Sequence, residues 1–451
     1  MERRQVTVPF TIPGERVRIE LREGGAHRAG PASAFARDIL RRSPHRVTPK
    51  CPHFGPGNQR DRGCGGCSWQ HIAYAEQLRL KASLVERLLR GALGRAPAVR
   101  PTLPGTEPND PWHYRQKVHF VFGNGGKPGG RRRGALVMGH YARSSRRIVA
   151  VRECPVHDDR GNRAAFALFD AFGPAGVAAA APSEPSGERV PDAGVLRSIA
   201  VRVASATPEV MATLVVADDG DKRLRVATRR AMAFPSAPTA LHLNVHPRGD
   251  AFIFGRETRR ISGPERLREE VAGTSFLISP AAFFQTNVRA ADTLVKLVLE
   301  VVPPDASVVD LYAGAGLFAL PLARRGQRVI AIEENRLAVG DGEASARLNR
   351  IPSSRCRFVV GRVETALGPI RTADAVVLDP PREGCSPEVL RDVLGRIRPA
   401  LVVYISCNPE ALARDLAEAR TFPYAIDMVQ PVDMFPHTAH VETVVTLTRR
   451  Q

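Results

Sequence analysis

The chain has 451 residues and a formal net charge of +19, and 43% of its residues are hydrophobic. This length and apolar content exclude a disordered chain and suggest about three domains of ordinary size. The sequence contains no run of about 18 apolar residues, the length needed to span a bilayer. Met1–Gln5 lack the apolar stretch of a secretion signal, so we expect a cytoplasmic protein. The basic charge favours a polyanionic partner such as RNA, although an arginine-rich proteome would raise the charge of any protein.

Residues 1–50 contain two short β-like runs, at residues 6–10 and 16–21, which are broken by glycine and proline. The runs predict a small basic β-barrel of the oligonucleotide-binding kind, a fold that binds single-stranded nucleic acid. The segment is short for such a barrel. A basic arm that packs on the main body is an equally good interpretation.

Seven cysteines, an odd number, are spaced unevenly along the chain, which favours metal binding or catalysis over disulfides. Cys64-Gly-Gly-Cys67 forms a close pair, with Cys51 upstream and Cys154 far downstream. The glycines let the backbone curl so that both sulfurs of the pair face one centre. Four thiolates predict a zinc ion or an iron–sulfur cluster, and the spacing does not choose between them.

The middle of the chain, residues 51–271, is predicted to form a central domain. Apolar residues at helical spacing predict an amphipathic helix over residues 69–94. Residues 112–153 are typical of β-hairpins, and strand-like runs resume from residue 194 to about residue 254. Between them, residues 173–191 are rich in Ala, Pro, Gly and Ser and predict a loop whose role is open.

The last part of the chain, residues 272–451, alternates strands with helices, which predicts an α/β domain with a doubly wound sheet. The expected strands are residues 307–312, 328–332, 355–360, 375–379, 401–405, 424–429 and 441–448. The connection before the last strand is too short for a crossover helix, so this strand is predicted to be antiparallel. Its first residues, including Glu442, then lie at the edge where the other strands have their carboxyl ends.

Polar residues collect at this edge, where open α/β sheets bind their ligands. Gly314 and Gly316 follow the first strand and permit close approach of a nucleoside, and Glu333 ends the second, where a carboxylate can bind ribose hydroxyls. Asp379-Pro-Pro-Arg follows the fourth strand, and acid-Pro-Pro is typical of methyltransferases that act on planar amino or ring atoms. Cys407 follows the fifth strand, although a lone cysteine is more often inert core filler than a nucleophile.

Ordered motifs run along the chain from about residue 6 to the C-terminus: Cys51–Gly55, Cys64–Cys67, Tyr114–Arg115, Glu153–Pro155, Ile278–Pro280, Phe284–Asn287, Asp310–Phe318, Asp379–Arg382, Ser406–Pro409 and His440–Thr443. Together they resemble the RNA 5-methyluridine methyltransferases, the uracil-C5 enzymes of transfer and ribosomal RNA that use S-adenosylmethionine (SAM). Two segments depart from the family pattern. Residues 52–63 form a longer loop than usual, and Arg362 stands where the family often has an acid near the adenine, which leaves the adenine contact open.

The resemblance implies a class I SAM-methyltransferase domain at the C-terminus, a β-rich central domain that holds a [4Fe–4S] cluster, and a TRAM-type RNA-binding barrel in residues 1–50. It implies that Cys407 attacks C6 of uracil and that Glu442 later removes the C5 proton. The implied cofactor contacts are Gln285, Tyr312, Gly314, Gly316, Leu317, Glu333 and Asp379. The implied cluster ligands are Cys51, Cys64, Cys67 and Cys154, with zinc as the alternative metal.

The most similar branch of the family modifies 23S ribosomal RNA, so we expect ribosomal RNA as the substrate, transfer RNA as the alternative, no membrane partner and a monomer. Three other functions fit less well. A catalytically silent RNA-binding assembly factor would have lost the nucleophile or the base, and this chain has both. An iron–sulfur electron carrier would have no use for the C-terminal sheet that is predicted to bind the cofactor. A methyltransferase of exocyclic amines would use the acid-Pro-Pro motif without Cys407, and a surface strand carboxylate is the other interpretation of Glu442.

Overall fold

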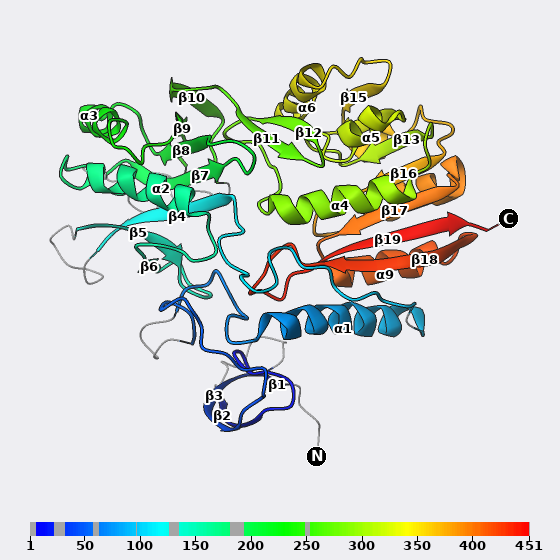
Figure 1. The fold of residues 1–451 in the computed structure, drawn as a ribbon, viewed down its shortest axis with the longest axis horizontal. Helices are drawn as coiled ribbons and strands as arrows, with labels where there is room; N and C mark the ends of the chain where they lie inside the picture. The colour runs from blue at the N-terminus through cyan, green and yellow to red at the C-terminus, as the bar shows by residue number, and fades with distance from the viewer. Residues whose placement is uncertain are drawn as a thin grey trace.

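The computed structural model describes residues 6–21, 32–56, 63–95, 97–125, 135–180, 194–248 and 253–450. Three sheets follow one another along the chain, with a short hairpin between the second and the third (Figure 1). The residues outside these ranges include 181–193, which hold most of the predicted 173–191 loop. No helix within the described ranges is long and apolar enough to cross a membrane.

The N-terminal sheet consists of β1 (Val6–Thr7), β2 (Arg16–Leu21) and β3 (Ala32–Arg41) in the order β1-β3-β2. β1 runs parallel to β3, and β2 runs antiparallel to it. The expected β structure of this region is confirmed, whereas a closed barrel stays a prediction. The Arg46 guanidinium fastens the sheet to the next segment, because it binds the buried Glu15 carboxylate at 2.7 Å.

Helix α1 (Tyr74–Leu93) confirms the amphipathic helix expected over residues 69–94. It ends at Gly94, whose left-handed backbone closes the last turn. Its apolar side packs on α9 and β18 of the C-terminal sheet, where Val85, Leu89 and Leu93 join the core (Figure 1). A helix from the predicted central domain therefore completes the core of the third sheet, and the domain limits at residues 50 and 271 stay predictions.

The central sheet has seven strands in the order β10-β9-β8-β7-β4-β5-β6. They are β4 (Lys117–Asn124), β5 (Leu136–Tyr141), β6 (Ile148–Ala150), β7 (Leu196–Val203), β8 (Val210–Val216), β9 (Ala240–Val245) and β10 (Glu257–Ser262). Helices α2 (Asp159–Phe172) and α3 (Lys222–Ala231) pack on it and on each other. The expectation of strands alone between residues 194 and 254 is incomplete, because α3 connects the parallel strands β8 and β9.

The hairpin β11 (Leu267–Val271) and β12 (Thr274–Ile278) leads into the C-terminal sheet. Its strands are β13 (Ser307–Leu311), β14 (Arg328–Glu333), β15 (Cys356–Val360), β16 (Ala375–Leu378), β17 (Leu401–Ser406), β18 (Tyr424–Val432) and β19 (Glu442–Arg449). The order β15-β14-β13-β16-β17-β19-β18 confirms a doubly wound sheet, and β19 is antiparallel to both neighbours, as predicted. The chain reverses its winding direction between β13 and β16, the usual place for a ligand.

Helices cover both faces of the C-terminal sheet and bury two apolar cores. One core lies under α4 (Val288–Val301), α5 (Ala319–Arg325) and α6 (Arg336–Leu348). The other lies under α1, the short α7 (Val363–Ala366), α8 (Pro387–Arg391) with the π-helical turn η1 (Asp392–Ile397), and α9 (Pro409–Ala419). The carboxyl ends of the parallel strands point toward the central sheet (Figure 1). The edge that carries Asp379, Cys407 and Glu442, which we name the catalytic edge, therefore faces the middle of the molecule.

Candidate active site and cysteine centre

Cys407 and Glu442 come together because two antiparallel strands pair in register. Ser406, the last residue of β17, is paired with Thr443, so Cys407 follows one strand where Glu442 opens the other. Cys407 lies in a tight strand-to-helix turn, since the side chain of Asn408 caps α9 and also donates to the Arg382 carbonyl at 2.9 Å. The sheet itself therefore brings the predicted nucleophile and the predicted base to one place.

The Cys407 thiol is half-buried, and burial raises its pKa to about 11. The neighbouring carboxylates of Glu442 and Asp379 contribute to this increase in pKa, and the Arg382 guanidinium opposes it. The protein without bound molecules therefore keeps the thiol protonated at neutral pH. Attack by this sulfur requires loss of its proton, so ionisation has to accompany substrate binding or reaction.

The side chain of Glu442 is buried, and burial together with the charge of Asp379 raises its pKa to about 8, against the lowering effect of Arg382. Asp379 follows β16, and burial raises its pKa to about 7. The three acidic groups therefore titrate far from their ordinary ranges at one edge of the sheet. Such a concentration of perturbed pKa values beside a cation is typical of a functional site.

The loop after β13 has three residues with left-handed backbone: Tyr312, Gly314 and Gly316, with φ of 62°, 56° and 83°. A Cβ atom at Gly314 would meet nothing within 4 Å, whereas one at Gly316 would lie 2.8 Å from the Phe358 ring. Gly314 therefore borders open space that a ligand can fill, and Gly316 lets the loop pack on β15.

Glu333, the last residue of β14, accepts hydrogen bonds from the backbone amides of Gly314 at 2.9 Å and Asn335 at 2.8 Å. Leu317 is buried behind the loop. The open space at Gly314 and the half-buried Glu333 carboxylate fit the adenosyl part of a nucleoside cofactor. After β15, Arg362 forms an ion pair with Glu364 at 3.5 Å. The two side chains that could contact the adenine of the cofactor therefore lie next to each other.

Asp310 lies in the middle of β13, is fully buried, and has no hydrogen-bond partner among the described residues for either carboxylate oxygen. Burial and the charges of Asp379 and Glu333 raise its pKa well above the ordinary value. Sequence reasoning did not single out this residue, although an acid within an otherwise apolar strand was a usable signal. Asp310 therefore adds a buried carboxyl with a raised pKa beneath the glycine loop.

Gln285 lies on the segment between β12 and α4, which contacts both large sheets. Arg202 of β7 donates to the carbonyl oxygens of Phe284 and Gln285 at 3.4 and 3.5 Å. Asn287 caps α4 and donates to the carbonyls of Gly105 and Met434. The segment is therefore held in the space between the central sheet and the catalytic edge, where Gln285 is half-buried.

The cysteine centre, which we define as Cys51, Cys64, Cys67 and Cys154, collects thiols from three separate segments. The Cys64 amide donates to the His53 carbonyl at 2.9 Å, and the Asn162 side chain bonds both the amide and the carbonyl of Cys154. Burial, together with the charges of the other three cysteines, raises the pKa of Cys154 to about 12. Four mutually repelling thiolates fit a bound metal cation or cluster, which would neutralise them.

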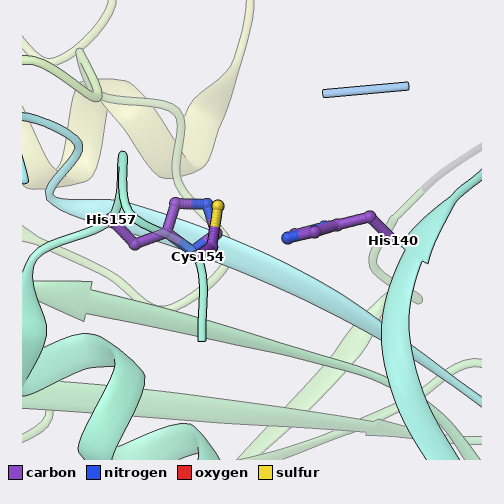
Figure 2. A group of neighbouring side chains, drawn as sticks. All are labelled: His140, Cys154 and His157. Carbon is purple, nitrogen blue, oxygen red and sulfur yellow. The ribbon is translucent and has the colours of Figure 1, made fainter. Parts of the chain in front are cut away.

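Two histidines lie beside Cys154, one of the four residues of the cysteine centre. The ligand atoms of His140, Cys154 and His157 all lie within 4.8 Å of one another (Figure 2). Within the described part of the chain, His140 Nε2 and His157 Nδ1 have no hydrogen-bond partner. Burial lowers the pKa of His140 to about 4, so its ring is neutral and able to ligate or to donate to sulfur. Sequence reasoning missed both residues, although the spacing Cys154-x2-His157 was a signal for the second.

The remaining cysteines, Cys356 and Cys385, lie buried in the two cores of the C-terminal sheet and take no part in either site. The structure thus brings together Cys407, Glu442 and Asp379 at the catalytic edge. It gathers the glycine loop with Glu333 at the same edge. The four predicted thiols lie near enough for their charges to act on one another, but among the described residues only Cys154, with His140 and His157, belongs to a group of three ligand atoms within 4.8 Å of one another.

Comparison with known proteins gives a consistent result. The family model described as tRNA (uracil-5-)-methyltransferase matches residues 367–450. An uncharacterized RNA methyltransferase of Gloeobacter violaceus is 37% identical over 418 residues, which cover 91% of this chain and 85% of that protein. Another, from Thermosynechococcus vestitus, is 35% identical over 451 residues, which cover 99% and 93%.

The crystal structure of Pyrococcus abyssi tRNA (uracil-54, C5)-methyltransferase in complex with S-adenosyl-L-homocysteine is similar with a TM-score of 0.74 and 27% identity. The similarity covers 98% of this chain and 95% of that one. The matches confirm the family that the ordered motifs resemble and extend over nearly the whole chain. The chain belongs to the RNA uracil-C5 methyltransferase family and uses S-adenosylmethionine.

Proposed function

We propose that this enzyme forms 5-methyluridine in ribosomal RNA, with Cys407 as the nucleophile and Glu442 as the base. The observation that carries the proposal is the pairing of Ser406 with Thr443, because it supports a site in which thiol and carboxyl face one substrate ring. The effect of the Glu442 carboxylate on the pKa of Cys407 supports the same arrangement.

The chemistry needs both groups because C5 of uracil is a poor nucleophile. The Cys407 thiolate adds to C6, the electrons of the C5–C6 double bond move toward C5 and O4, and C5 becomes an enolate carbon. SAM, when bound, supplies the methyl group that C5 takes. Glu442 then accepts the C5 proton, the C5–C6 double bond re-forms, and the C6–sulfur bond breaks to release the thiolate.

Residues of the catalytic edge have separate roles in this proposal. Asp379 orients the uracil or the cofactor, and Gln285 contacts both. Tyr312, Gly314, Gly316 and Leu317 shape the cofactor loop, and Glu333 binds the ribose hydroxyls. The open space at Gly314 and the free lone pairs left on the Glu333 carboxylate support these roles. The target uridine has to leave its stack to reach the edge, which costs on the order of a few kcal/mol.

For the cysteine centre we propose a [4Fe–4S] cluster, with zinc as the other candidate. The four thiols are the donors that both choices prefer, and the repulsion among them supports a cationic occupant. When bound, the cluster ties the segments around Cys51, Cys64–Cys67 and Cys154 into one unit. Analysis of iron, sulfide and zinc in anaerobically purified protein decides between the two.

The choice of ribosomal RNA rests on the cysteine centre and on the N-terminal β region, which we propose to be a TRAM-type RNA-binding domain over residues 1–50. The central domain would then span residues 51–271 and the methyltransferase domain residues 272–451. Transfer RNA is the second candidate. It is favoured by the similarity to the Pyrococcus abyssi enzyme, whose name gives tRNA uracil-54 as its target.

The test is mass spectrometry of nucleosides from RNA that has been incubated with the protein and SAM. Unmodified ribosomal RNA and unmodified transfer RNA are compared for the wild type, Cys407→Ala and Glu442→Gln. We expect 5-methyluridine in ribosomal RNA with the wild type, none with Cys407→Ala, and a trapped protein–RNA adduct with Glu442→Gln. Methylation of transfer RNA alone would replace the substrate that we propose, and full activity of Cys407→Ala would overturn the mechanism.

A further inference from the structure

The loop from Asp433 to Val441 joins β18 to β19 and ends at Glu442, and we name it the base loop. Its backbone carbonyls receive hydrogen bonds from several distant segments. Asn287 donates to Met434 at 3.0 Å, and Tyr114 donates to Pro436 at 3.0 Å. The base loop is therefore positioned from outside the sheet as well as by its flanking strands.

His437 is the residue of the base loop with the most polar contacts to other segments. Its backbone has the left-handed φ of 64°, and its side chain is 3% exposed. The carbonyl accepts from the backbone amides of Ser68 at 3.0 Å and Trp69 at 2.8 Å, and the amide donates to Gln77 Oε1 at 2.8 Å. An unfavourable backbone conformation for a histidine is thus held by three hydrogen bonds.

The imidazole of His437 is fixed as firmly as its backbone. Its Nδ1 lies 3.2 Å from the amide nitrogen of Gln77, and its Nε2 lies 2.8 Å from the Pro111 carbonyl. These partners assign a proton to Nε2 and none to Nδ1, which is the neutral form. The Trp112 ring stacks on it at 4.0 Å between centroids. Rotation of the ring would therefore leave buried polar atoms without partners.

The segment that holds His437 is the one that carries two thiols of the cysteine centre. Ser68 directly follows Cys67, and Gln77 also donates to the carbonyls of Trp69 and Ile72. Trp69, Gln77 and His437 consequently move as one hydrogen-bonded unit. A shift of the backbone at Cys67 would be transmitted to His437 by the next residue, Ser68, whose amide donates to the His437 carbonyl.

A second anchor lies next to this unit and acts on the start of the base loop. Lys81 and Asp433 form an ion pair in which both side chains are fully buried, and Lys81 also donates to the Phe435 carbonyl at 3.0 Å. Both Lys81 and Gln77 belong to α1. Helix α1 therefore holds the start of the base loop through Lys81 and its middle through Gln77. The cysteine segment, which we define as Cys64–Trp69, holds the middle as well, through the amides of Ser68 and Trp69.

We propose that His437 is a positioning residue through which the cysteine segment sets the place of Glu442. The proposal rests on the proposed function, since it concerns the base of that reaction. Cys407 lies on the turn between β17 and α9, and its position is set by that turn and by β19. Loosening of His437 is therefore expected to slow removal of the C5 proton more than attack by sulfur or transfer of the methyl group.

The chemical consequence is a shift in which step limits the reaction. With Glu442 displaced, the methylated ring keeps its C5 proton, the C6–sulfur bond stays intact, and the enzyme remains attached to RNA. The adduct accumulates until the carboxylate accepts the proton and the thiolate leaves. A residue that merely stabilised the fold would instead lower all steps together.

The experiment uses full-length protein, RNA that the wild type methylates, and SAM with a labelled methyl group. Denaturing gels separate labelled adduct from labelled free RNA during a single turnover. His437→Ala is compared with His437→Asn, because asparagine tolerates the left-handed backbone and keeps an acceptor for Gln77. The matched control is Asn244→Ala, which removes a fully buried amide with three donated hydrogen bonds in β9, far from the base loop.

We expect His437→Ala to raise the ratio of adduct to free methylated RNA by about tenfold, while methyl incorporation falls less than about threefold. His437→Asn is expected to lie between it and the wild type, and Asn244→Ala is expected to leave the ratio unchanged. The proposal is overturned if His437→Ala lowers adduct and product in equal measure, or if the control raises the ratio as much.

A second measurement does not depend on activity. Hydrogen exchange in peptides from residues 433–443 is compared for the wild type, His437→Asn, Cys67→Ser and wild type treated with a chelator. Faster exchange of the base loop in all three altered samples supports the link. Exchange that rises only in residues 51–70 of the Cys67→Ser and chelated samples overturns it. If no RNA acquires 5-methyluridine but hydrogen exchange in the base loop still rises in the altered samples, the proposed function is refuted. The link between the cysteine segment and the base loop would then still be supported.

Discussion

The catalytic edge and the cysteine centre are assembled in opposite ways. At the catalytic edge, Asp379, Cys407 and Glu442 each occupy the end of a strand in a single sheet. In the cysteine centre, the thiols come from loops around residues 51, 64–67 and 154, and the strand pairing of Cys64 is limited to an isolated β-bridge to Ala142. Hydrogen bonds from single side chains such as Asn162 and Arg143 position these loops instead.

This difference predicts how each site behaves without its bound group. The strand ends at the catalytic edge are kept in register by backbone bonds and by two apolar cores, so the edge is formed before any ligand binds. The cysteine centre instead accumulates thiols that oppose one another's ionisation. The first site is preorganised by the fold, and the second needs a cation to be stable with all four thiols ionised.

The strongest test of this contrast is Cys407→Ala. Loss of the sulfur removes the covalent step, so methyl transfer is expected to fall by at least about 10³-fold. Since the edge is preorganised, SAM affinity measured by calorimetry is expected to change less than about twofold. The control is Cys356→Ala, which also removes a thiol and is expected to retain activity. Cys356 is buried at the first position of β15, at the end of the strand away from the catalytic edge.

Removal of metal tests the other half of the contrast. Cys67→Ser is expected to lose most of the bound metal and to lower the melting temperature by about 5 °C or more, because one fewer thiolate holds the three segments together. Metal content, melting temperature and SAM affinity are measured on the same samples. Retained metal with an unchanged melting temperature would show that Cys67 is not a ligand. A large loss of SAM affinity would show that the cofactor-binding part of the catalytic edge depends on the cysteine centre.

Two glycines of the loop after β13 have different roles: Gly314 borders the space for the cofactor, and Gly316 packs against Phe358. Gly314→Ala places a methyl group in open space at a left-handed residue, so the KM for SAM is expected to rise about tenfold with a loss of stability of about 1 kcal/mol. Gly316→Ala directs the methyl group at the Phe358 ring, so its main effect is expected on the melting temperature. The reverse order of effects in titrations and thermal scans would contradict the assignment of the open space to the cofactor.

Much of the C-terminal part could be predicted from sequence, for a physical reason. Buried parallel strands are apolar runs bounded by turns, and their carboxyl ends meet at one edge, so residues such as Glu333, Asp379 and Cys407 could be placed by counting strands. The short connection before β19 even gave its direction, which put Glu442 beside Cys407. Pairing in a sheet converts sequence position into spatial position by a simple rule.

Other parts of the structure could not be predicted in this way, because no such rule relates their sequence positions to their places in the fold. Helix α3 has few apolar positions among its charged residues, so its periodicity is weak, and its buried side chains are Leu224, Ala227, Thr228 and Ala231. The packing of α1 on α9 is a long-range contact that no local pattern encodes. His140 and His437 owe their places to loops and to hydrogen bonds that depend on the folded structure. Single histidines without a motif gave no signal.

The smallest expected effect concerns Arg382, whose charge joins the electrostatics of the catalytic edge. Its guanidinium lowers the pKa of both Cys407 and Glu442, so Arg382→Gln is expected to raise both values. Because both groups act in their ionised forms, the rising limb of the rate against pH would move to higher pH. Arg382 is exposed and screened by solvent, which limits the movement to about one pH unit or less.

Single-turnover rates between pH 6.5 and 9.5 measure this movement, with Arg382→Lys as the variant that keeps a positive charge. At pH 7 the glutamine variant is expected to be a few-fold slower than the wild type. The part of the difference that comes from Glu442 is expected to narrow above pH 9, because the pKa of that carboxyl is about 8. Added salt is expected to narrow it as well, since screening weakens the charge that the wild type retains. A loss of rate that is equal at every pH would mean that Arg382 acts through contact with the substrate, and the electrostatic balance at the catalytic edge would then be set by burial and by the neighbouring carboxylates alone.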